Sequence, residues 1–347
     1  MLLEHPEFSK LMRNPEFTQD ITTIVVDEVH CISQWGDDFR KSYQQLNKLR
    51  SCVAIDVPFL AASATLPPTV LAEVQLYLCI SMERMFLVNL GNDRHNITPA
   101  ICRMRGGAKD LPALDFLTDE AVLGTPLKRT IVFFNARETT YNAYKYIQRL
   151  LPEDIKDQVD FVHSGRSPGA INDTMARFRC NETKILFATE AAGMGMDIPD
   201  IERVIQYMVP KSLSVWTQRL GRAGRSGQPA LVIILVEPSV YQVRKSKVTA
   251  LREPKKRKLG EDEEPSEEPD DDDEHEDEVE DEDVESDELE QISKTDVDVK
   301  TIASQGLVYV KRLEQGMRYW VECKTCRRRV ANKYFKNPPQ QDGNQYI

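Results

Sequence analysis

Two carboxylates and a histidine stand together near the start of the chain, in the run Asp27-Glu28-Val29-His30. They follow residues 21–26, a β-branched run typical of a buried strand. A carboxylate at the end of such a strand suits Mg²⁺ coordination, which we assign to Asp27, and a second one suits orientation of an attacking water, which we assign to Glu28. Taken alone, the four residues are a weak signal, and a solvated strand end is the better explanation of them.

The next stretch of sequence fits neither the period of a helix nor that of a strand. It contains Gln34, Trp35, Phe39 and Arg40 around Gly36. Aromatic rings and a guanidinium group suit stacking on bases and pairing with phosphates. The alternative interpretation is a set of aromatic side chains that anchor a loop to its own domain.

Two later segments combine small residues with groups that suit phosphate binding. Residues 187–197, FATEAAGMGMD, place Thr189, Gly195 and Asp197 where a strand ends, and their glycines allow the backbone to approach a phosphate. The alternative is an ordinary glycine-rich turn.

Residues 218–227, QRLGRAGRSG, contain Gln218 and Gly221 with two arginines, Arg222 and Arg225, three positions apart. That spacing predicts both guanidinium groups on one side of a helix end, where their forked donors suit phosphate oxygens. A nonspecific phosphate-binding patch is the alternative.

The elements that must position these residues alternate along the chain. Helical spacing is predicted at residues 69–78, 139–151, 171–178 and 215–220. Short apolar runs lie at 21–26, 59–62, 130–134, 159–162, 184–188, 203–207 and 230–236. This pattern predicts an α/β fold whose parallel sheets are buried on both faces, with ligands beyond the carboxyl ends of the strands.

In their order along the chain, the motifs resemble those of the RecQ family of ATP-dependent DNA helicases, DExH proteins of superfamily 2. The resemblance rests on DEVHCISQWG followed by DFR, and on the segments 187–197 and 218–227. Weaker matches in the same order are Ser63-Ala64-Thr65, Arg94-His95-Asn96-Ile97, residues 131–135 and His163-Ser164-Gly165. The resemblance covers roughly residues 1–240 and, more weakly, 306–336.

The resemblance implies that ATP, Mg²⁺ and single-stranded DNA meet between two RecA-like lobes, of which the first is partial. Residues 1–90 correspond to the C-terminal part of the first lobe and residues 91–245 to the second. The implied catalytic residues are Asp27 with Mg²⁺, Glu28, His30, Arg222 and Arg225, the last as the arginine finger. The implied nucleotide contacts are Gly195, Asp197, Gln218 and Gly221, and the implied DNA contacts are Gln34, Trp35, Phe39, Arg40 and Thr189.

Parts of the family pattern have no counterpart in this sequence. No G-x-x-x-x-G-K-[ST] phosphate loop occurs in the 347 residues, so we expect a fragment, a degenerate copy or a product completed by another chain. Residues 301–347 resemble the start of the RecQ zinc-binding subdomain at Cys326 and Tyr334-Phe335. Cys323 and Cys326 supply two of the four ligands that structural zinc takes, so zinc is expected only in a longer chain.

Charge is distributed very unevenly along the chain. Residues 261–290 contain 22 Asp and Glu and no Lys or Arg, and setting them aside changes the formal net charge from −11 to +11. We predict that residues 246–300 are a disordered basic and acidic linker. Its run PKKRKL, residues 254–259, has the form of a nuclear import signal or a nucleic-acid patch, and the acidic run could contact histones, mimic nucleic acid or act only as a solubilising segment.

Composition excludes some classes of protein. A hydrophobic fraction of 41% excludes a mostly disordered chain, and no apolar run approaches the ~20 residues of a membrane helix. Seven cysteines with a single C-x-x-C pair indicate a reducing compartment.

The leading hypothesis is a nuclear 3′–5′ DNA helicase acting on single-stranded and forked duplex DNA in recombination and repair. Two alternatives remain open. The first is a catalytically silent module that binds single-stranded DNA through the basic body. The second is a chromatin interaction protein that works through the acidic insert.

Overall fold

The computed structural model describes residues 5–34, 46–53, 57–190, 198–245 and 307–339. The chain divides into two compact units, Met1–Tyr241 with Lys311–Ile347, and Gln242–Val310. The described part of the smaller unit is an antiparallel pair of strands, β9 (Val243–Lys245) and β10 (Leu307–Tyr309). The site residues that the structure describes all belong to the larger unit.

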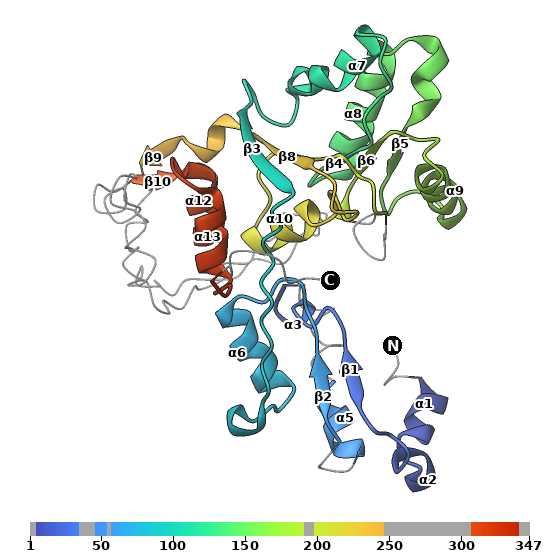
Figure 1. The fold of residues 1–347 in the computed structure, drawn as a ribbon, viewed down its shortest axis with the longest axis vertical. Helices are drawn as coiled ribbons and strands as arrows, with labels where there is room; N and C mark the ends of the chain where they lie inside the picture. Colours follow the sequence, from blue (N-terminus) through green and yellow to red (C-terminus); the bar gives the residue numbers. More distant parts are fainter. Residues whose placement is uncertain (1–4, 35–45, 54–56, 191–197, 246–306, 340–347) are drawn as a thin grey trace, which may run out of the picture. The chain divides into compact units, whose positions relative to one another are not determined.

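A six-stranded, fully parallel sheet forms the centre of the second lobe (Figure 1). Its order is β3-β8-β7-β4-β6-β5, and these strands span Ile97–Arg103 (β3), Thr130–Phe133 (β4), Val159–Val162 (β5), Ile185–Ala188 (β6), Arg203–Tyr207 (β7) and Ala230–Val236 (β8). The central strands are short runs of buried apolar residues. That composition is typical of parallel strands with both faces covered.

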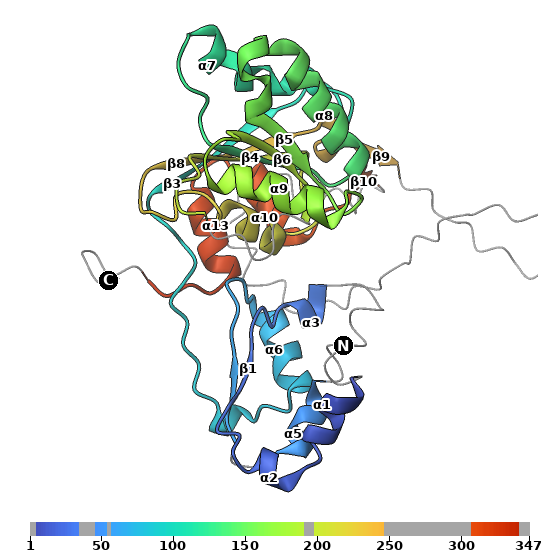
Figure 2. The ribbon, with the colours of Figure 1, turned by 90° about the vertical axis from the view of Figure 1, so that its right-hand side faces the viewer.

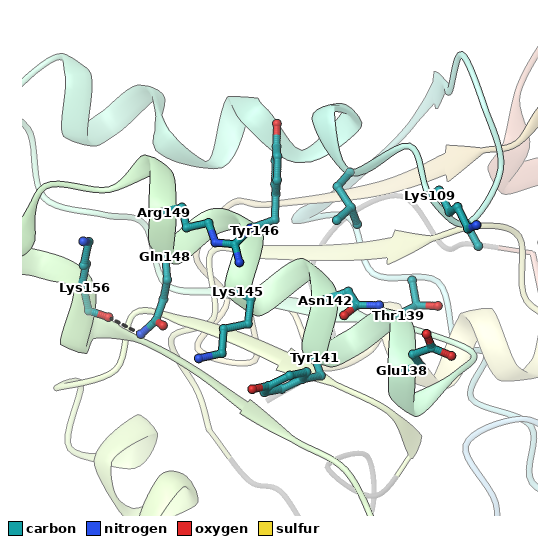
Figure 3. A pocket seen from close by; sticks show the side chains of 12 residues that line it. Lys109, Glu138, Thr139, Tyr141, Asn142, Lys145, Tyr146, Gln148, Arg149 and Lys156 are labelled. Carbon is teal, nitrogen blue, oxygen red and sulfur yellow. Dashed lines mark hydrogen bonds between the residues drawn. The ribbon is translucent and has the colours of Figure 1, made fainter.

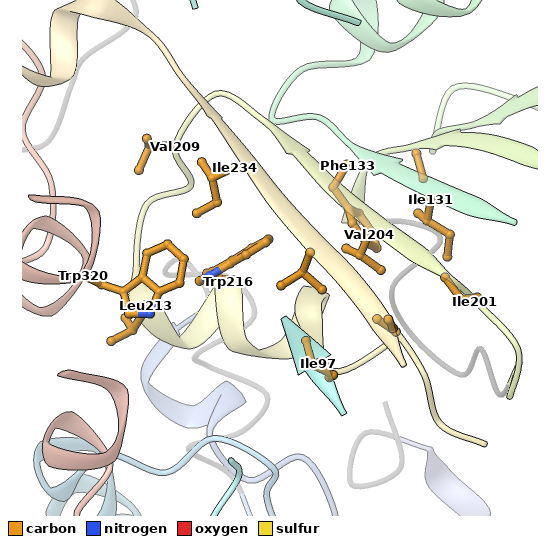
Figure 4. Packing of buried hydrophobic residues seen from close by; sticks show 14 of the residues in the cluster. Ile97, Ile131, Phe133, Ile201, Val204, Val209, Leu213, Trp216, Ile234 and Trp320 are labelled. Carbon is orange, nitrogen blue, oxygen red and sulfur yellow. The ribbon is translucent and has the colours of Figure 1, made fainter. Parts of the chain in front are cut away.

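Alternate residues of β4, together with Phe134, which directly follows it, supply two separate cores. Ile131 and Phe133 belong to the cluster on one face, while Val132 and Phe134 belong to the cluster on the other. Strand geometry requires this division, because successive side chains point to opposite faces of a sheet. Figure 4 shows the first cluster, in which Trp216 and Trp320 pack edge to face with ring centroids 5.7 Å apart.

Helices cover both faces of the sheet (Figure 2). One face carries α8 (Arg137–Leu150), the 3₁₀ segment η2 (Leu111–Thr118) and α7 (Asp119–Val122), with the 3₁₀ segment η3 (Glu153–Gln158) after α8. The other face carries α9 (Pro168–Arg179) and α10 (Leu213–Leu220), and the C-terminal helices α12 (Gln315–Glu322) and α13 (Arg327–Tyr334) add buried side chains to its core. Residues near the C-terminal end of the chain therefore complete the hydrophobic core of the second lobe.

The N-terminal segment forms a smaller α/β layer. Strands β1 (Ile24–Val26) and β2 (Phe59–Ala61) pair in parallel, and α6 (Pro68–Tyr77) packs its Val70 and Val74 beside Val26. The remaining elements are α1 (Pro6–Leu11), α2 (Pro15–Thr18), α3 (Cys31–Gln34), α5 (Asn47–Cys52) and the 3₁₀ turns η1 (Met82–Arg84) and, after β8, η5 (Pro238–Val240). Val25 and Leu60 are more than half exposed on this two-stranded layer.

The predicted α/β fold with parallel sheets is confirmed. Residues 159–162, 203–207 and 230–236 are strands with the predicted bounds, whereas β1 is limited to its last three residues. The linker predicted at residues 246–300 lies outside the described residues. No described helix has the length and apolar character needed to span a bilayer.

Shortening a central core residue tests this packing. Ile131→Ala should lower the free energy of unfolding by about 2–5 kcal/mol, because the side chain is fully buried and its removal leaves a cavity. Leu231→Ala on β8 is the matched control; its side chain is 36% exposed, so about 1 kcal/mol or less is expected. Urea unfolding followed by circular dichroism measures both, and equal losses would contradict the buried position of β4.

Candidate functional site

Asp27 and Glu28 lie where the backbone leaves β1. Glu28 has φ +48°, a left-handed conformation that is rare for a residue with a side chain, and its N–H donates to Asp27 Oδ1 at 2.8 Å. The Val29 N–H donates to the carbonyl of Ala62 at 3.0 Å, which ties the turn to the end of β2. Strained backbone of this kind persists where surrounding contacts hold it, often at functional sites. The Asp27 carboxylate stays exposed at the carboxyl end of the strand.

His30 is buried between the two strand ends. Burial lowers the pKa of the imidazole, and the nearby carboxylates of Glu28 and Asp27 oppose that shift only in part. The ring is therefore neutral at pH 7, with one donor and one acceptor nitrogen. Its Nδ1 lies 2.9 Å from Ser63 Oγ and 3.3 Å from Glu28 Oε2.

Gln218 of α10 contacts both His30 and Thr65. Its Nε2 donates to Thr65 Oγ1 at 3.1 Å and also bonds to His30 Nε2. An amide nitrogen can only donate, so His30 Nε2 is the acceptor and Nδ1 carries the proton. Ser63 Oγ then accepts from Nδ1 and donates to the carbonyl of Thr65 at 3.0 Å. One directed chain of hydrogen bonds thus joins three motifs that are far apart in sequence.

The arginines of this motif follow the helix instead of lying on it. Helix α10 ends at Leu220, so Arg222 and Arg225 lie in the turn that follows; Arg222 is half-buried and Arg225 exposed. The sequence analysis predicts both arginines at a helix end, and the helix ends at Leu220, where the predicted helical spacing also ends. Gly224 has φ +53°, and a Cβ there would lie 2.7 Å from Asn96 Nδ2.

The turn is held by its backbone carbonyls. Arg94 donates to the carbonyls of Gly221 at 3.2 Å and Ala223 at 2.9 Å, and also to that of Gly224. Burial, together with the positive charge of Arg225, lowers the pKa of Arg94. The two guanidinium groups are therefore close enough to interact.

Arg219 is buried and faces the sheet. Its guanidinium donates to Gln206 Oε1 at 2.6 Å and Asn135 Oδ1 at 3.2 Å, and it also pairs with Glu190. These three partners follow or end β4, β6 and β7. Arg219 thereby fixes α10 to the carboxyl end of the sheet, where ligands bind in folds of this class.

The start of α10 is capped from the C-terminal segment. Glu314 Oε2 accepts from the N–H of Leu213 at 2.7 Å, while Ser212 Oγ accepts from Val215. Burial raises the pKa of Glu314, although its bonds from Tyr334 and Leu213 act in the opposite direction. The first-turn N–H groups of a helix need such acceptors when water cannot reach them.

The C-terminal segment also holds the stretch of backbone that leads into β3. Arg328 of α13 donates to the carbonyl of Arg94 at 2.9 Å and to that of Ile97, and it pairs with Asp93. Arg94 in turn holds the turn of Arg222 and Arg225. Residues 314 and 328 therefore act on the two ends of the α10 segment.

The structure brings together part of the predicted site. His30, Gln218 and Gly221 lie in the contacts above, and the convergence of Asp27, Glu28, Arg222 and Arg225 on one nucleotide stays a prediction. Thr189 lies at the end of β6, where its N–H donates to Val162 at 3.2 Å. Trp35, Phe39, Arg40, Gly195, Asp197 and the side chain of Gln34 lie outside the described residues.

The predicted metals differ in how well the chain fits them. An exposed carboxylate at a strand end, as at Asp27, is a suitable hard ligand for Mg²⁺. Cys326 is exposed and Cys323 is buried 3.6 Å from Thr325 Oγ1. Across the described ranges, no three His, Cys, Asp or Glu side chains gather as metal ligands, so zinc does not fit there.

Several residues of the site escaped the sequence analysis as functional residues. Arg94 and Arg219 were part of recognised motifs, but their positions in those strings do not reveal what they contact. Glu314 and Arg328 act across about 100 and 230 residues of sequence, so no local spacing predicts them. Ser63 and Thr65 were identified by position and now have direct partners.

Comparison with known proteins gives matches over the same two regions. Residues 2–74 match the DEAD/DEAH box helicase family and residues 113–227 match the helicase conserved C-terminal domain. The bifunctional 3′-5′ exonuclease/ATP-dependent helicase WRN of Mus musculus is 29% identical over 256 residues, covering 72% of this chain and 18% of that protein. The ATP-dependent DNA helicase RecQ of Bacillus subtilis is 30% identical over 231 residues, covering 65% of this chain and 36% of that protein.

Among solved structures, the DEAD-box helicase Mss116 bound to ssRNA and UDP-BeF matches with a TM-score of 0.54 at 18% identity, over 65% of this chain and 46% of that chain. This likeness shows a shared RecA-like fold. The chain spans about a fifth to a third of the length of these two curated relatives.

The hydrogen-bond chain predicts the titration of His30. Nitrogen NMR of labelled protein should show a neutral ring at pH 7 with the proton on Nδ1, and a midpoint below 6.5. Because the unfolded chain takes up this proton at higher pH than the native one, the free energy of unfolding should fall as pH drops below about 6.5. His30→Gln should lessen that fall, and a proton on Nε2 at pH 7 would contradict the assigned direction.

The cap on α10 predicts a second pH effect. A raised carboxyl pKa means that the native state binds this proton more tightly, so its contribution to stability declines as pH rises above the ordinary value of 4.5. Glu314→Gln stays neutral and keeps an acceptor oxygen, so wild type should lose stability relative to this variant as pH rises. Glu314→Ala should cost about 0.5–2 kcal/mol through the lost cap. Urea unfolding at pH 4.5 and pH 7 tests both, and a relative gain for wild type would refute the assignment.

Proposed function

We propose that this chain, which is similar to RecQ-type helicases of superfamily 2, serves ATP-dependent DNA unwinding with 3′–5′ polarity. The proposal includes a role in recombination and repair, action on single-stranded and forked DNA, and a nuclear location that depends on residues 254–259. The observation that carries it is the contact of Gln218 with His30 and Thr65. A helicase motor needs such a contact, because a change at the bound nucleotide in the N-terminal segment must alter the position of the second lobe.

Each acidic residue at the end of β1 has a distinct proposed role. Asp27 would hold Mg²⁺, which neutralises charge on phosphate oxygens when bound. Glu28 accepts a proton from the attacking water and orients it. Its left-handed backbone sets the direction of its side chain, and its Oε2 lies 3.3 Å from His30 Nδ1. A change at Glu28 is therefore transmitted to Gln218 through one imidazole ring.

The two arginines after α10 supply positive charge to the same proposed pocket. Arg225 is assigned as the arginine finger, with Arg222 as a second phosphate contact. Arg94 fixes the turn by its carbonyls and adds a neighbouring positive charge. Gly221 belongs to that turn, and Gly195 and Asp197 are proposed to meet the nucleotide.

DNA contacts are proposed for Gln34, Trp35, Phe39, Arg40 and Thr189. The basic body, +11 without residues 261–290, supports binding of a phosphate backbone. The same charge also favours the second candidate function, a module that binds single-stranded DNA without turnover, because no phosphate loop of the usual form occurs in the sequence.

Replacement of Glu28 by glutamine separates the two functions. Glu28→Gln keeps size and hydrogen bonding but removes the base, so DNA-stimulated ATP hydrolysis by purified residues 1–347 should fall by about 10²–10⁴-fold. Glu83→Gln, at an exposed position of the same segment, is the matched control and should leave the rate unchanged. DNA binding by wild type without turnover would favour the silent module, and turnover that survives in Glu28→Gln would end the proposed role of this residue.

A further inference from the structure

A hollow of about 770 Å³ lies beside α8 on the second lobe, apart from the site described above (Figure 3). Its walls come from α8, from the segment leading into η2, and from Lys156 of η3. That volume is within the range of ligand-binding clefts. It is large enough for a few residues of an extended peptide.

Basic side chains dominate this pocket. Lys109, Lys145 and Arg149 are exposed, and within the described parts of the chain none of the three forms an ion pair. The fourth, Lys156, is paired with Glu153 at 2.5 Å. Glu138 is the one carboxylate among the lining residues, so the lining carries an excess of positive charge.

The aromatic residues here are not arranged as a platform for bases. Lys145 Nζ lies over the ring of Tyr141 at 5.6 Å from its centroid, and 6.0 Å from that of Tyr144. Tyr146 is engaged through its hydroxyl, which donates to Asp115 Oδ1 at 2.7 Å. Stacking of bases needs open ring faces, so these contacts favour an anionic ligand other than single-stranded nucleic acid.

The position of the pocket also favours a ligand other than single-stranded nucleic acid. The helicase motifs gather at the carboxyl ends of the strands, where β4 leads into α8 at Arg137. The pocket extends along α8 toward Arg149 and toward η3, which precedes the start of β5. It therefore runs away from the edge of the sheet where nucleotide and nucleic acid bind in such folds.

We propose that this pocket binds an acidic polypeptide, and that its occupant is the run of residues 261–290 of this same chain. The run carries 22 carboxylates and no Lys or Arg, which matches the unpaired charge of the pocket. Nineteen residues separate Tyr241 from this run, and an extended chain of that length reaches about 63 Å, more than the ~30 Å across a small domain.

Each ion pair between the pocket and residues 261–290 is weak, but the two partners belong to the same chain, which strengthens their binding. An exposed ion pair is worth at most about 1 kcal/mol, so a free acidic peptide of this kind binds poorly. Attachment to the same chain raises the local concentration of the run to the millimolar range. Because the pairs are solvent-exposed, salt must weaken the contact. The proposal does not depend on ATP hydrolysis.

Carbodiimide cross-linking of the full chain tests the proposal directly. The reagent condenses a lysine amine with a carboxylate to an amide, with water taken up by the reagent, so it reports lysines that touch acidic residues. Cross-links from residues 261–290 should concentrate on Lys109 and Lys145 at low salt and be lost near 0.5 M NaCl. Arg149→Ala removes one charge but no cross-linkable amine, so the yield at Lys145 should drop about two- to fivefold.

Arg179→Ala is the matched control, since Arg179 is equally exposed but lies at the end of α9 on the opposite face of the sheet. It should leave the yield at Lys145 unchanged. Equal yields at exposed lysines elsewhere, such as Lys48 and Lys211, would overturn the proposal. A single-stranded oligonucleotide that protects Lys109 and Lys145 from acetylation, without any cross-link to the acidic run, would assign the pocket to nucleic acid and also overturn it.

Discussion

Helix α10 is short and its ends are closely packed, so its free backbone groups need partners from other segments. Ser212 and Glu314 accept the N–H groups of its first turn, and Arg94 takes the carbonyls of the turn that follows it. Arg328 holds the backbone beside Arg94. An eight-residue helix is marginal on its own, so these contacts and its buried face determine its place. The rest of the candidate site is built on that placement.

The neutral state of His30 gives the network its direction. The hydrogen bonds that run from Gln218 through His30 and Ser63 to Thr65 all point in one direction. The amide nitrogen at one end can only donate, and the carbonyl at the other end can only accept. Burial of His30 keeps the ring neutral, although two carboxylates lie nearby. A change in the charge or position of Glu28 must therefore alter a hydrogen bond that reaches α10. This is a local, testable form of communication between two motifs 190 positions apart.

Sequence reasoning succeeded where burial on both faces dominates. The strands at residues 159–162, 203–207 and 230–236 are mainly apolar, the last of them throughout, and their bounds were predicted correctly. Strand β3 was missed because Pro99 and Thr98 interrupt its pattern. Proline is acceptable there only because β3 is an edge strand, which depends on the topology and not on the local sequence. The ion pairs and caps of Glu314 and Arg328 were unpredictable for the same reason, since they exist only after the C-terminal helices pack on the second lobe.

The arginines in and directly after α10 differ in their surroundings. A guanidinium has five N–H donors, and Arg219 directs its donors to Gln206, Asn135 and Glu190 while being only 6% exposed. Such a side chain cannot also bind a phosphate without breaking the contacts that hold α10. Arg222 and Arg225 lie beyond the helix in a turn whose carbonyls, not side chains, are held by Arg94. The fold thus uses a buried arginine to fix a short segment, while Arg222 and Arg225, for which phosphate recognition is proposed, lie in the turn that follows it.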